Sequence, residues 1–564
     1  MLSDIAISKK ARIQPIERIA SSLKIDKKYL TRYGNYISKI ELSILDKIKH
    51  RKQGKYILVT AITPTPLGEG KTVTTIGLSM ALNRLKKSAS CCIRQPSLGP
   101  VFGIKGSAAG GGYSQVLPRG DFDLHFTGDA HAVGLAHNIA AAFLDNSLYR
   151  GNSRDIDIDK IYWRRVVDIG DRSLRNLKIG LGSKTDGVPR ESGFDITASS
   201  ELMAILALSE DLADLKKRLE RIVLAETKPG GALTTKEIKV AGLMAVLLKD
   251  AIKPNLIQTI ENTPCFVHTG PFANIAHGNS SIIQDKIALA LSDYVVTEAG
   301  FGADCGAEKF FDIKCRTSGL KPDAAVIVCS LRALKAHSGI CRVVPGKPLE
   351  ECLSEENMEA LEIGTSNLEK QIENIRVFGI PAVVAINKFS ADSEKEIEFV
   401  RKKALGFGAY DCRVSEVWQK GSRGGVDLGR AVVSAARQKS DFRFLYPLEI
   451  PIEEKIKAIA TKIYGARDVE YSGLAQSKIS SYKEKGWDKL PICMAKTHLS
   501  LSHNPELKGR PSDFILPIRD IRAFIGAGFL SPLCGSVQTM PGLPSHPRGE
   551  NIDIDAKGNI IGLS

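Results

Sequence analysis

Short apolar runs that end in polar or glycine residues recur along the chain and predict the strands of one sheet. The runs at 56–62, 294–297, 324–329 and 381–386 are rich in β-branched or small apolar residues and have the length of buried strands. Helical segments, such as the amphipathic stretch 203–220, separate them. Strands that alternate with helices are typical of a parallel sheet with helices on both faces. We therefore predict a doubly wound α/β fold with ligands at the carboxyl ends of the strands.

The run at 56–62 leads into a candidate phosphate-binding loop, Thr65-Pro66-Leu67-Gly68-Glu69-Gly70-Lys71-Thr72, and then into a segment with helical spacing, 73–82. In a strand–loop–helix unit of this kind, backbone N–H groups and the helix N-terminus bind a phosphate chain. Lys71 would reach the β- and γ-phosphates, and the Thr72 hydroxyl would hold Mg²⁺. Thr65 stands where the usual pattern has its first glycine, and an ordinary glycine turn is the alternative.

A glycine-rich segment over 101–118, with three successive glycines at 110–112, is too flexible for a regular helix or a central strand. We expect a loop whose backbone approaches a ligand closely. Arg94 and Lys105 would supply positive charge there for an anion. A flexible linker is the alternative, but a linker would lack the apolar residues interspersed in this segment.

The chain changes character near 345–370 and again near 450, and this predicts three domains. We expect a P-loop NTPase-like nucleotide-binding domain with a mostly parallel sheet over 1–360. A second, smaller domain over 361–450 would contribute to the ligand site, and a C-terminal domain would span 451–564. The two smaller domains are expected to be α/β or α+β.

A formal net charge of +15 raises the question of a nucleic-acid partner. The basic residues are spread along the chain and stand beside acidic ones where they cluster, as in 214–221. Only 6% of the residues are aromatic, so few rings could stack on bases. We therefore predict no nucleic-acid partner and interpret the charge as a solvated basic surface suited to anionic small molecules.

The composition, with 43% hydrophobic and 25% charged residues, is that of an ordinary globular protein. There is no apolar run of 18 residues and no basic start followed by an apolar stretch, so we expect neither a membrane span nor a secretory signal. The eleven cysteines include no CxxC pair, which predicts reduced, mostly buried thiols in a cytoplasmic protein.

Two histidines, His131 and His137, lie close in sequence to Asp123 and Asp129 and raise the question of a metal site. No histidine pair here has the i, i+4 spacing of a helical zinc site, and no cysteine joins them. A structural or substrate-orienting role is therefore the favoured interpretation.

Several long motifs resemble those of formate–tetrahydrofolate ligases, also called 10-formyltetrahydrofolate synthetases. The resemblance covers nearly the whole chain, and the phosphate loop of that family also begins with Thr-Pro, which accounts for Thr65. The matching blocks are 65–72, 96–100, 102–106, 125–129, 270–278, 298–304 and 540–544.

This resemblance implies an ATP-dependent ligation of formate to tetrahydrofolate. The products are 10-formyltetrahydrofolate, ADP and phosphate, and formyl phosphate is the intermediate. Phosphoryl transfer needs positioning and charge neutralisation rather than a protein nucleophile. Lys71, Arg94 and Mg²⁺ held by Thr72 would neutralise the charge, and Lys105 is a further candidate for contact with the anion.

The resemblance also implies a folate site. Phe389 and Trp418 would sandwich the pterin or an overlapping nucleotide ring, and Asp129 is a candidate polar contact. His125 or His268 could assist proton loss from the attacking nitrogen, and the residues do not select between them.

The chain departs from the family pattern at Gln95, where the family usually has a glutamate associated with a monovalent-cation site. Gln95 keeps an oxygen ligand but loses the charge, so we predict weak or altered activation by K⁺ or NH₄⁺. Thr269 stands where the family commonly has glycine, and Ser536 where it commonly has aspartate.

Two other functions remain open. One is a P-loop ATPase that drives a conformational change in a partner, in which case Phe389 and Trp418 would be core residues. The other is a catalytically weakened relative that binds folate. The expected partners are formate, ATP and tetrahydrofolate, the last in its polyglutamylated form, and the resemblance implies a homotetramer.

Overall fold

The largest element of the computed structural model, which describes residues 2–343 and 348–563, is a mixed β-sheet. Within these residues its 12 strands are β1 (Leu30–Tyr33), β2 (Ile37–Ile40), β3 (Lys55–Ala61), β4 (Ala89–Ile93), β5 (Gly110–Gly111), β6 (Ser114–Leu117), β14 (Asn255–Thr259), β15 (Pro264–Val267), β16 (Tyr294–Glu298), β17 (Ala324–Cys329), β18 (Ala382–Asn387) and β19 (Asp411–Ser415).

The strands from β15 to β19 run parallel, in the order β15, β4, β16, β3, β17, β18 and β19. The strands β1, β2, β6 and β14 join antiparallel on one side. The strands predicted at 56–62, 294–297, 324–329 and 381–386 correspond to β3, β16, β17 and β18. The predicted α/β class with a large, mostly parallel sheet is confirmed, and the carboxyl ends of the parallel strands meet at one edge.

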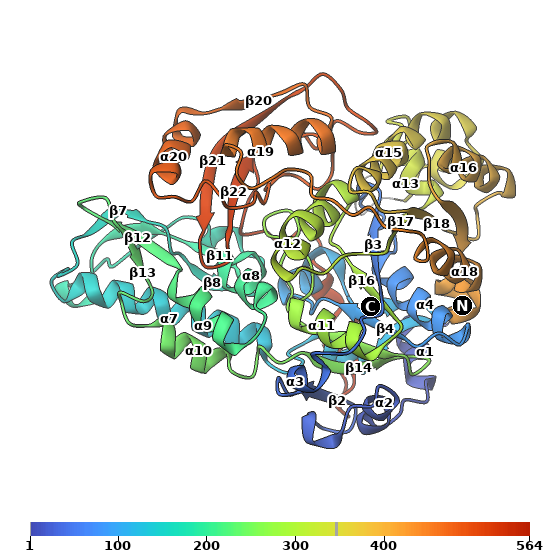
Figure 1. Ribbon diagram of the computed structural model, residues 1–564, viewed down its shortest axis with the longest axis horizontal. Coiled ribbons are helices and arrows are strands. Elements are labelled where there is room, and N and C mark those ends of the chain that lie inside the picture. Colours follow the sequence, from blue (N-terminus) through green and yellow to red (C-terminus); the bar gives the residue numbers. More distant parts are fainter. Residues whose placement is uncertain (1, 344–347, 564) are drawn as a thin grey trace.

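Helices cover both faces of this sheet, which is why its strands are apolar throughout rather than alternating. Ile57 and Val59 of β3 pack with α4 (Lys71–Arg84) and α18 (Val426–Ala435), whereas Leu58 points into the other core cluster. The helices whose residues join that other cluster include α11 (Ile282–Leu291), α13 (Leu331–His337), α15 (Met358–Arg376) and α16 (Glu394–Gly406). Figure 1 shows β3, β17 and β18 between these helices.

A lobe at the left of Figure 1 is built from helices and short strands between the glycine-rich segment and β14. Its small sheet has the order β13, β12, β7. Its elements are α7 (Asp129–Tyr149), β7 (Ile156–Ile161), β8 (Arg165–Val167), β9 (Leu177–Ile179), β10 (Arg190–Ser192), β11 (Phe194–Ile196), α8 (Glu201–Leu208), α9 (Leu212–Glu220), β12 (Val223–Thr227), β13 (Ala232–Thr234) and α10 (Ala241–Leu248).

The single helix predicted over 203–220 is wrong, because the chain breaks between α8 and α9. Ser209 has extended backbone dihedrals, and the Asp211 carboxylate accepts a hydrogen bond from the Asp214 N–H at 2.7 Å. This side chain caps the N-terminus of α9 and starts a new helix in a new direction.

Residues 361–450, which the sequence separates as a second domain, place β18 and β19 in the main sheet. Residues 451–564 bring a separate sheet of β20 (Asp468–Tyr471), β21 (Ile515–Phe524) and β22 (Phe529–Cys534), with α19 (Ile452–Ile459) and α20 (Gly473–Glu484) at the top of Figure 1. The domain boundaries themselves remain a prediction.

The remaining elements are short. The α-helices and strands among them are α1 (Asp4–Lys10), α2 (Ile16–Ser22), α3 (Ile44–Ile48), α5 (Leu98–Pro100), α6 (Arg119–Asp123), α12 (Arg316–Ser318), α14 (Glu351–Ser354), α17 (Val417–Lys420), β23 (Asp553–Ile554) and β24 (Ile560–Ile561). None of the helices in the described part of the chain is long and apolar enough to cross a membrane.

The expectation that all cysteines are free thiols is wrong at one place, because Cys341 and Cys352 form a disulfide. Their Cα atoms are 6.0 Å apart, within the usual range for such a bridge. The other nine cysteines are free and buried.

Candidate active site

The predicted phosphate loop, Thr65 to Thr72, joins the carboxyl end of β3 to α4. Gly68 and Gly70 have φ angles of +74° and +82°, a conformation that side chains with a Cβ rarely adopt. Gly70 is the N-cap of α4 and offers no side chain to the first turn. The N–H groups at this helix N-terminus therefore have the arrangement that binds a phosphate group.

Two side chains brace the loop. The buried Glu69 carboxylate accepts hydrogen bonds from the Thr65 N–H at 2.7 Å and the Thr65 hydroxyl at 3.2 Å. Asn387, the last residue of β18, donates from Nδ2 to the Glu69 carbonyl at 3.2 Å. A Cβ on Gly70 would lie 2.5 Å from that amide nitrogen, so this position requires glycine. The loop is thus held in shape before any ligand binds.

Glu298, the last residue of β16, is the centre of the candidate site. Its Oε2 accepts a hydrogen bond from the Thr72 hydroxyl at 2.8 Å, and its Oε1 lies 3.4 Å from Arg94 Nε. Arg94 also donates from Nη1 to the Pro271 carbonyl at 3.2 Å. Because β16 lies between β3 and β4, the loops that follow all three strands meet at this carboxylate.

Three cations act on Glu298 and on one another. Burial alone would raise the pKa of Glu298, but Arg94, Lys105, the Thr72 hydroxyl and Lys71 together hold it below its ordinary value. Removal from bulk water lowers the pKa of Lys71, an effect that Glu69 and Glu298 oppose. Partial loss of hydration lowers the pKa of Lys105, and the positive charge of Arg94 acts in the same direction. The site therefore holds more positive charge than its carboxylates balance.

Lys105 reaches this site from the glycine-rich segment. Val101–Lys105 forms a single π-helical turn, where the sequence predicts a loop, and Gly106 ends it with φ of +72°. Asp123 anchors the next turn, because its Oδ1 accepts the Ala108 N–H at 2.8 Å and its Oδ2 accepts the Ser107 hydroxyl.

The two predicted ring-binding residues follow adjacent strands. Phe389 follows β18, and the guanidinium of Arg332 lies 3.6 Å from the centre of its ring. Trp418 follows β19, and its indole Nε1 lies 3.0 Å from where a Cβ on Gly111 would stand. Both side chains are half-buried. The glycine-rich segment thus packs closely against Trp418, as the expected close backbone approach requires.

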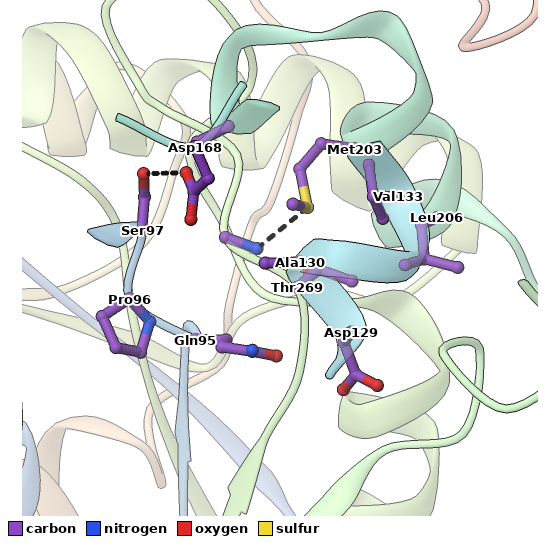
Figure 2. A pocket seen from close by; sticks show the side chains of 12 residues that line it. Gln95, Pro96, Ser97, Asp129, Ala130, Val133, Asp168, Met203, Leu206 and Thr269 are labelled. Carbon is purple, nitrogen blue, oxygen red and sulfur yellow. Dashed lines mark hydrogen bonds between the residues drawn. The ribbon is translucent and has the colours of Figure 1, made fainter. Parts of the chain in front are cut away.

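Gln95 lines a small cavity of about 10 Å³ at the carboxyl end of β4, with Asp129, Thr269 and Met203 among the other lining residues (Figure 2). Gln95 Oε1 and Thr269 Oγ1 are buried and lack hydrogen-bond partners in the described structure. Thr269 has φ of +53°, so the side chain stands on a strained backbone.

Asp129, by contrast, is fully engaged. Its carboxylate accepts hydrogen bonds from Lys39 Nζ at 2.7 Å, Asn255 Nδ2 at 2.8 Å and the Thr127 hydroxyl at 3.1 Å. Of the two carboxylates that line this cavity, Asp129 is therefore paired with a buried lysine, whereas Asp168 accepts hydrogen bonds from the Ser97 hydroxyl and the Leu98 N–H.

The two predicted histidines lie in different surroundings. His125 is exposed, in the turn between α6 and α7. His268 is fully buried, and its ring nitrogens lie 2.6 Å from both Ser281 Oγ and the Ala251 carbonyl oxygen. Burial lowers the pKa of His268 to about 4. Among the described residues, neither histidine forms a hydrogen bond or ion pair with Lys71, Arg94 or Glu298.

The structure thus brings together Thr72, Lys71, Arg94 and Lys105, and it adds Glu298 and Asn387. Both added residues had a similar signal in the sequence, because each is the first carboxylate or amide side chain after a strand-like run. Glu298 stood in a motif without an assigned role, since nothing in the pattern shows that the ends of β3, β4 and β16 converge.

Comparison with known proteins covers the whole chain. The family model described as formate–tetrahydrofolate ligase matches residues 2–564. The formate–tetrahydrofolate ligase of Roseiflexus castenholzii is 55% identical over 564 residues, with 100% of both chains covered. Those of Desulforamulus reducens and Saccharopolyspora erythraea are 52% and 51% identical, with 100% of this chain and 99% of each relative covered. The similarity therefore includes every strand end described above.

Proposed function

The chain belongs to the formate–tetrahydrofolate ligase family, and we propose that it carries out the family reaction at the cations around Glu298. The family catalyses the ATP-dependent formylation of tetrahydrofolate with formate. The contacts of Arg94 and Thr72 with Glu298, beside Lys71 at the start of α4, carry the proposal. The γ-phosphate of ATP and formyl phosphate are both anions that such a cluster stabilises.

The nucleotide site is proposed to be of the doubly wound P-loop type. Support comes from the succession of β3, glycine loop and α4, and from the helices on both sheet faces. ATP would place its phosphates on the N–H groups at the start of α4, with Lys71 beside the terminal phosphate.

Mg²⁺ would be held by the Thr72 hydroxyl and the Glu298 carboxylate. These two oxygen donors lie 2.8 Å apart, and hydroxyl and carboxylate oxygens are the ligands that Mg²⁺ prefers. The bound ion would neutralise charge on the phosphates.

In the first step, a formate oxygen attacks the γ-phosphorus, formyl phosphate forms and ADP leaves. No protein nucleophile is needed, since this transfer depends on alignment and charge neutralisation. Arg94 is suited to orient formate, because Glu298 and the Pro271 carbonyl already fix its guanidinium. Lys71 and Lys105 balance the charge on the transferring phosphoryl group.

In the second step, the ten-position nitrogen of tetrahydrofolate attacks the formyl carbon and phosphate leaves. The oxyanion that develops needs hydrogen-bond donors, which backbone N–H groups of the glycine-rich segment can supply. The proton lost from the nitrogen would pass to His125 or to water. The buried His268 has both ring nitrogens engaged, which favours a structural role for it.

The folate ring, or an overlapping nucleotide ring, would lie at Phe389 and Trp418. Both rings follow strands adjacent in the sheet, and both remain partly exposed for stacking. Arg332 over Phe389 adds positive charge near this position. The overall basic charge favours polyglutamylated folates through long-range attraction.

We propose that a monovalent cation binds weakly at the Gln95 cavity and activates the enzyme only weakly. Gln95 Oε1 and Thr269 Oγ1 are two unpartnered buried oxygens beside this cavity, and K⁺ is bound by oxygen donors of this kind. Both donors are neutral, and the Asp129 charge is already paired with Lys39. Weak binding is therefore expected.

Formation of 10-formyltetrahydrofolate from formate, Mg-ATP and tetrahydrofolate, followed by absorbance after acid conversion to the methenyl form, tests the proposal. Product that requires all three substrates supports the ligase. ATP hydrolysis without formate would favour an ATPase that drives a partner. Folate binding without turnover would favour a weakened relative.

A homotetramer is proposed from the family resemblance. The helices α7 and α10 pack against each other. Their exposed apolar side chains support an interface between copies of the chain, and these are Leu135, Phe143, Leu243 and Val246. Light scattering coupled to size-exclusion chromatography would measure the mass, and a monomer at micromolar concentration would contradict it.

A further inference from the structure

A segment of the C-terminal part, Lys496–Ser500, reaches the phosphate-loop site. Lys496 forms a buried ion pair with Asp304 at 2.9 Å, with side chains 0% and 1% exposed. Its Nζ also donates to the Ser500 carbonyl at 2.6 Å, which fixes the turn between them. Asp304 lies six residues after Glu298, so this pair ties the segment to the loop that leaves the centre of the site.

His498, inside this segment, stacks on Phe301 of the same loop. The ring centres are 4.0 Å apart and the planes are inclined by 20°. Phe301 has φ of +62°, an uncommon conformation for a residue with a bulky side chain. Among the described residues no hydrogen bond fixes the His498 ring, so the stack is the contact that holds the two side chains together.

The charges around His498 favour its neutral form. Its pKa is lowered to about 4, mainly by burial and also by the cations of Lys496 and Lys71, while Asp304 acts in the opposite direction. A neutral ring stacks on phenylalanine without the cost of burying a charge.

We propose that His498 is a positioning residue of the nucleotide site, whose ring holds Phe301 and, through it, the loop 298–304 against the phosphate-binding loop. This rests on the proposed function of that site. Glu298 begins the loop and contacts both Thr72 and Arg94, so a displaced loop would disturb the groups that balance charge during phosphoryl transfer. The C-terminal part thus completes a site built mainly by the large sheet.

Steady-state kinetics of His498→Ala and His498→Phe test the role of the ring. His498→Ala should lower kcat about tenfold and change the KM for ATP less than about threefold, because the stack positions groups rather than binding the nucleotide. His498→Phe keeps a flat ring without nitrogen and should restore most of the lost kcat. His503→Ala is the matched control, since that histidine lies in the next turn with its ring 6.3 Å from Phe514 and outside the site.

A value of kcat for His498→Ala within about twofold of wild type would overturn the proposal. So would His498→Phe being as slow as His498→Ala, because a nitrogen rather than the ring would then matter. If His498→Ala does not fold, Phe301→Leu removes the same stack from the other partner and should give the same loss of kcat.

Hydrogen–deuterium exchange of the peptide containing 298–304 measures how firmly the loop is held, independently of catalysis. Exchange should rise in His498→Ala and stay at the wild-type level in His498→Phe and His503→Ala. Wild-type protein that forms no product would refute the proposed function while leaving this measurement valid. Unchanged exchange in His498→Ala would refute the positioning role alone.

Discussion

Two regions of this molecule gather charged side chains in different ways. Around Glu298, the three cations Lys71, Arg94 and Lys105 face two carboxylates, Glu298 and Glu69. Deeper in the fold, the buried Lys309 and Lys455 donate to backbone carbonyls, whereas four other buried lysines each pair with one carboxylate. These pairs are Lys39 with Asp129, Lys314 with Asp285, Lys335 with Glu396 and Lys496 with Asp304.

This difference in charge balance distinguishes the candidate active site from the structural ion pairs. A balanced pair is neutral as a unit, and its hydrogen bonds offset the cost of taking both charges out of water. An excess of positive charge has no such compensation within the protein, and an anionic ligand would supply it. We therefore expect the cations beside Glu298 to mark the ligand-binding end of this sheet.

The largest effect on activity is expected from Lys71→Ala. Removal of one group that stabilises transition-state charge should lower kcat by about 10²–10³-fold. The melting temperature should stay the same or rise, because the cations at the site repel one another. Arg84→Ala on the same helix, an exposed residue, is the control for loss of a positive charge. A Lys71→Ala variant that loses stability but keeps the wild-type kcat per folded molecule would contradict the assignment of Lys71 to the site.

A stability effect of similar weight is expected on the balanced side, from Lys314→Met. Asp285 accepts hydrogen bonds from both Lys314 and the Tyr56 hydroxyl, and loss of the lysine leaves a buried carboxylate. Breaking one partner of a buried pair costs about 3–5 kcal/mol. Denaturant titration should detect this loss, while kcat per folded molecule stays near wild type.

The matched control is Lys403→Met, which breaks the partly exposed pair with Glu362. Its effect on the free energy of unfolding should be about 0–1 kcal/mol. Equal losses in the two variants would mean that burial does not distinguish the pairs.

The sequence predicted the cations of the site better than their arrangement. Apolar runs located β3, β16, β17 and β18, and parallel strands necessarily bring their carboxyl ends to one edge. Arg94 directly follows β4, and Lys71 stands at the end of the glycine loop after β3, so local patterns were enough to find them. The position of Glu298 between them depends on β16 inserting between β3 and β4, which no local pattern encodes.

Contacts between distant parts of the chain also could not be predicted from local sequence patterns. His498 meets Phe301 across about 200 residues of sequence, and Lys39 meets Asp129 through the antiparallel side of the sheet. The break between α8 and α9 was missed for another reason, because Asp211 looks like an ordinary polar position until its capping hydrogen bond is seen.

A smaller effect, a few-fold change in activity, is expected from Gln95→Glu. The new carboxylate would stand in a cavity where the Asp129 charge is already paired, so the cavity would gain net negative charge. Stimulation of kcat by K⁺ should therefore increase over that of wild type. Ligase assays with K⁺ exchanged for a bulky organic cation measure this, and Asn138→Asp, outside the cavity, is the control. Equal stimulation of Gln95→Glu and wild type would show that charge at this position does not govern cation binding.

The smallest effect concerns Glu201, a buried carboxyl with no paired cation. It accepts hydrogen bonds from the N–H groups of Gly526 at 2.7 Å and Ala527 at 3.2 Å, and burial raises its pKa to about 8. Between its ordinary pKa of 4.5 and about 8, the folded protein binds more protons at this group than the unfolded chain does. Stability should therefore fall as pH rises through this window.

Glu201→Gln stays neutral and keeps an oxygen for the same two N–H groups, so its melting temperature should fall less than that of wild type between pH 5 and pH 8. The difference should be a few degrees, measured by calorimetry at several pH values. Glu484→Gln, at an exposed carboxylate, should follow the wild-type curve. Parallel curves for Glu201→Gln and wild type would mean that this carboxyl ionises in the folded protein as easily as in the unfolded chain. An unpaired buried carboxyl would then cost this fold no more than a balanced pair.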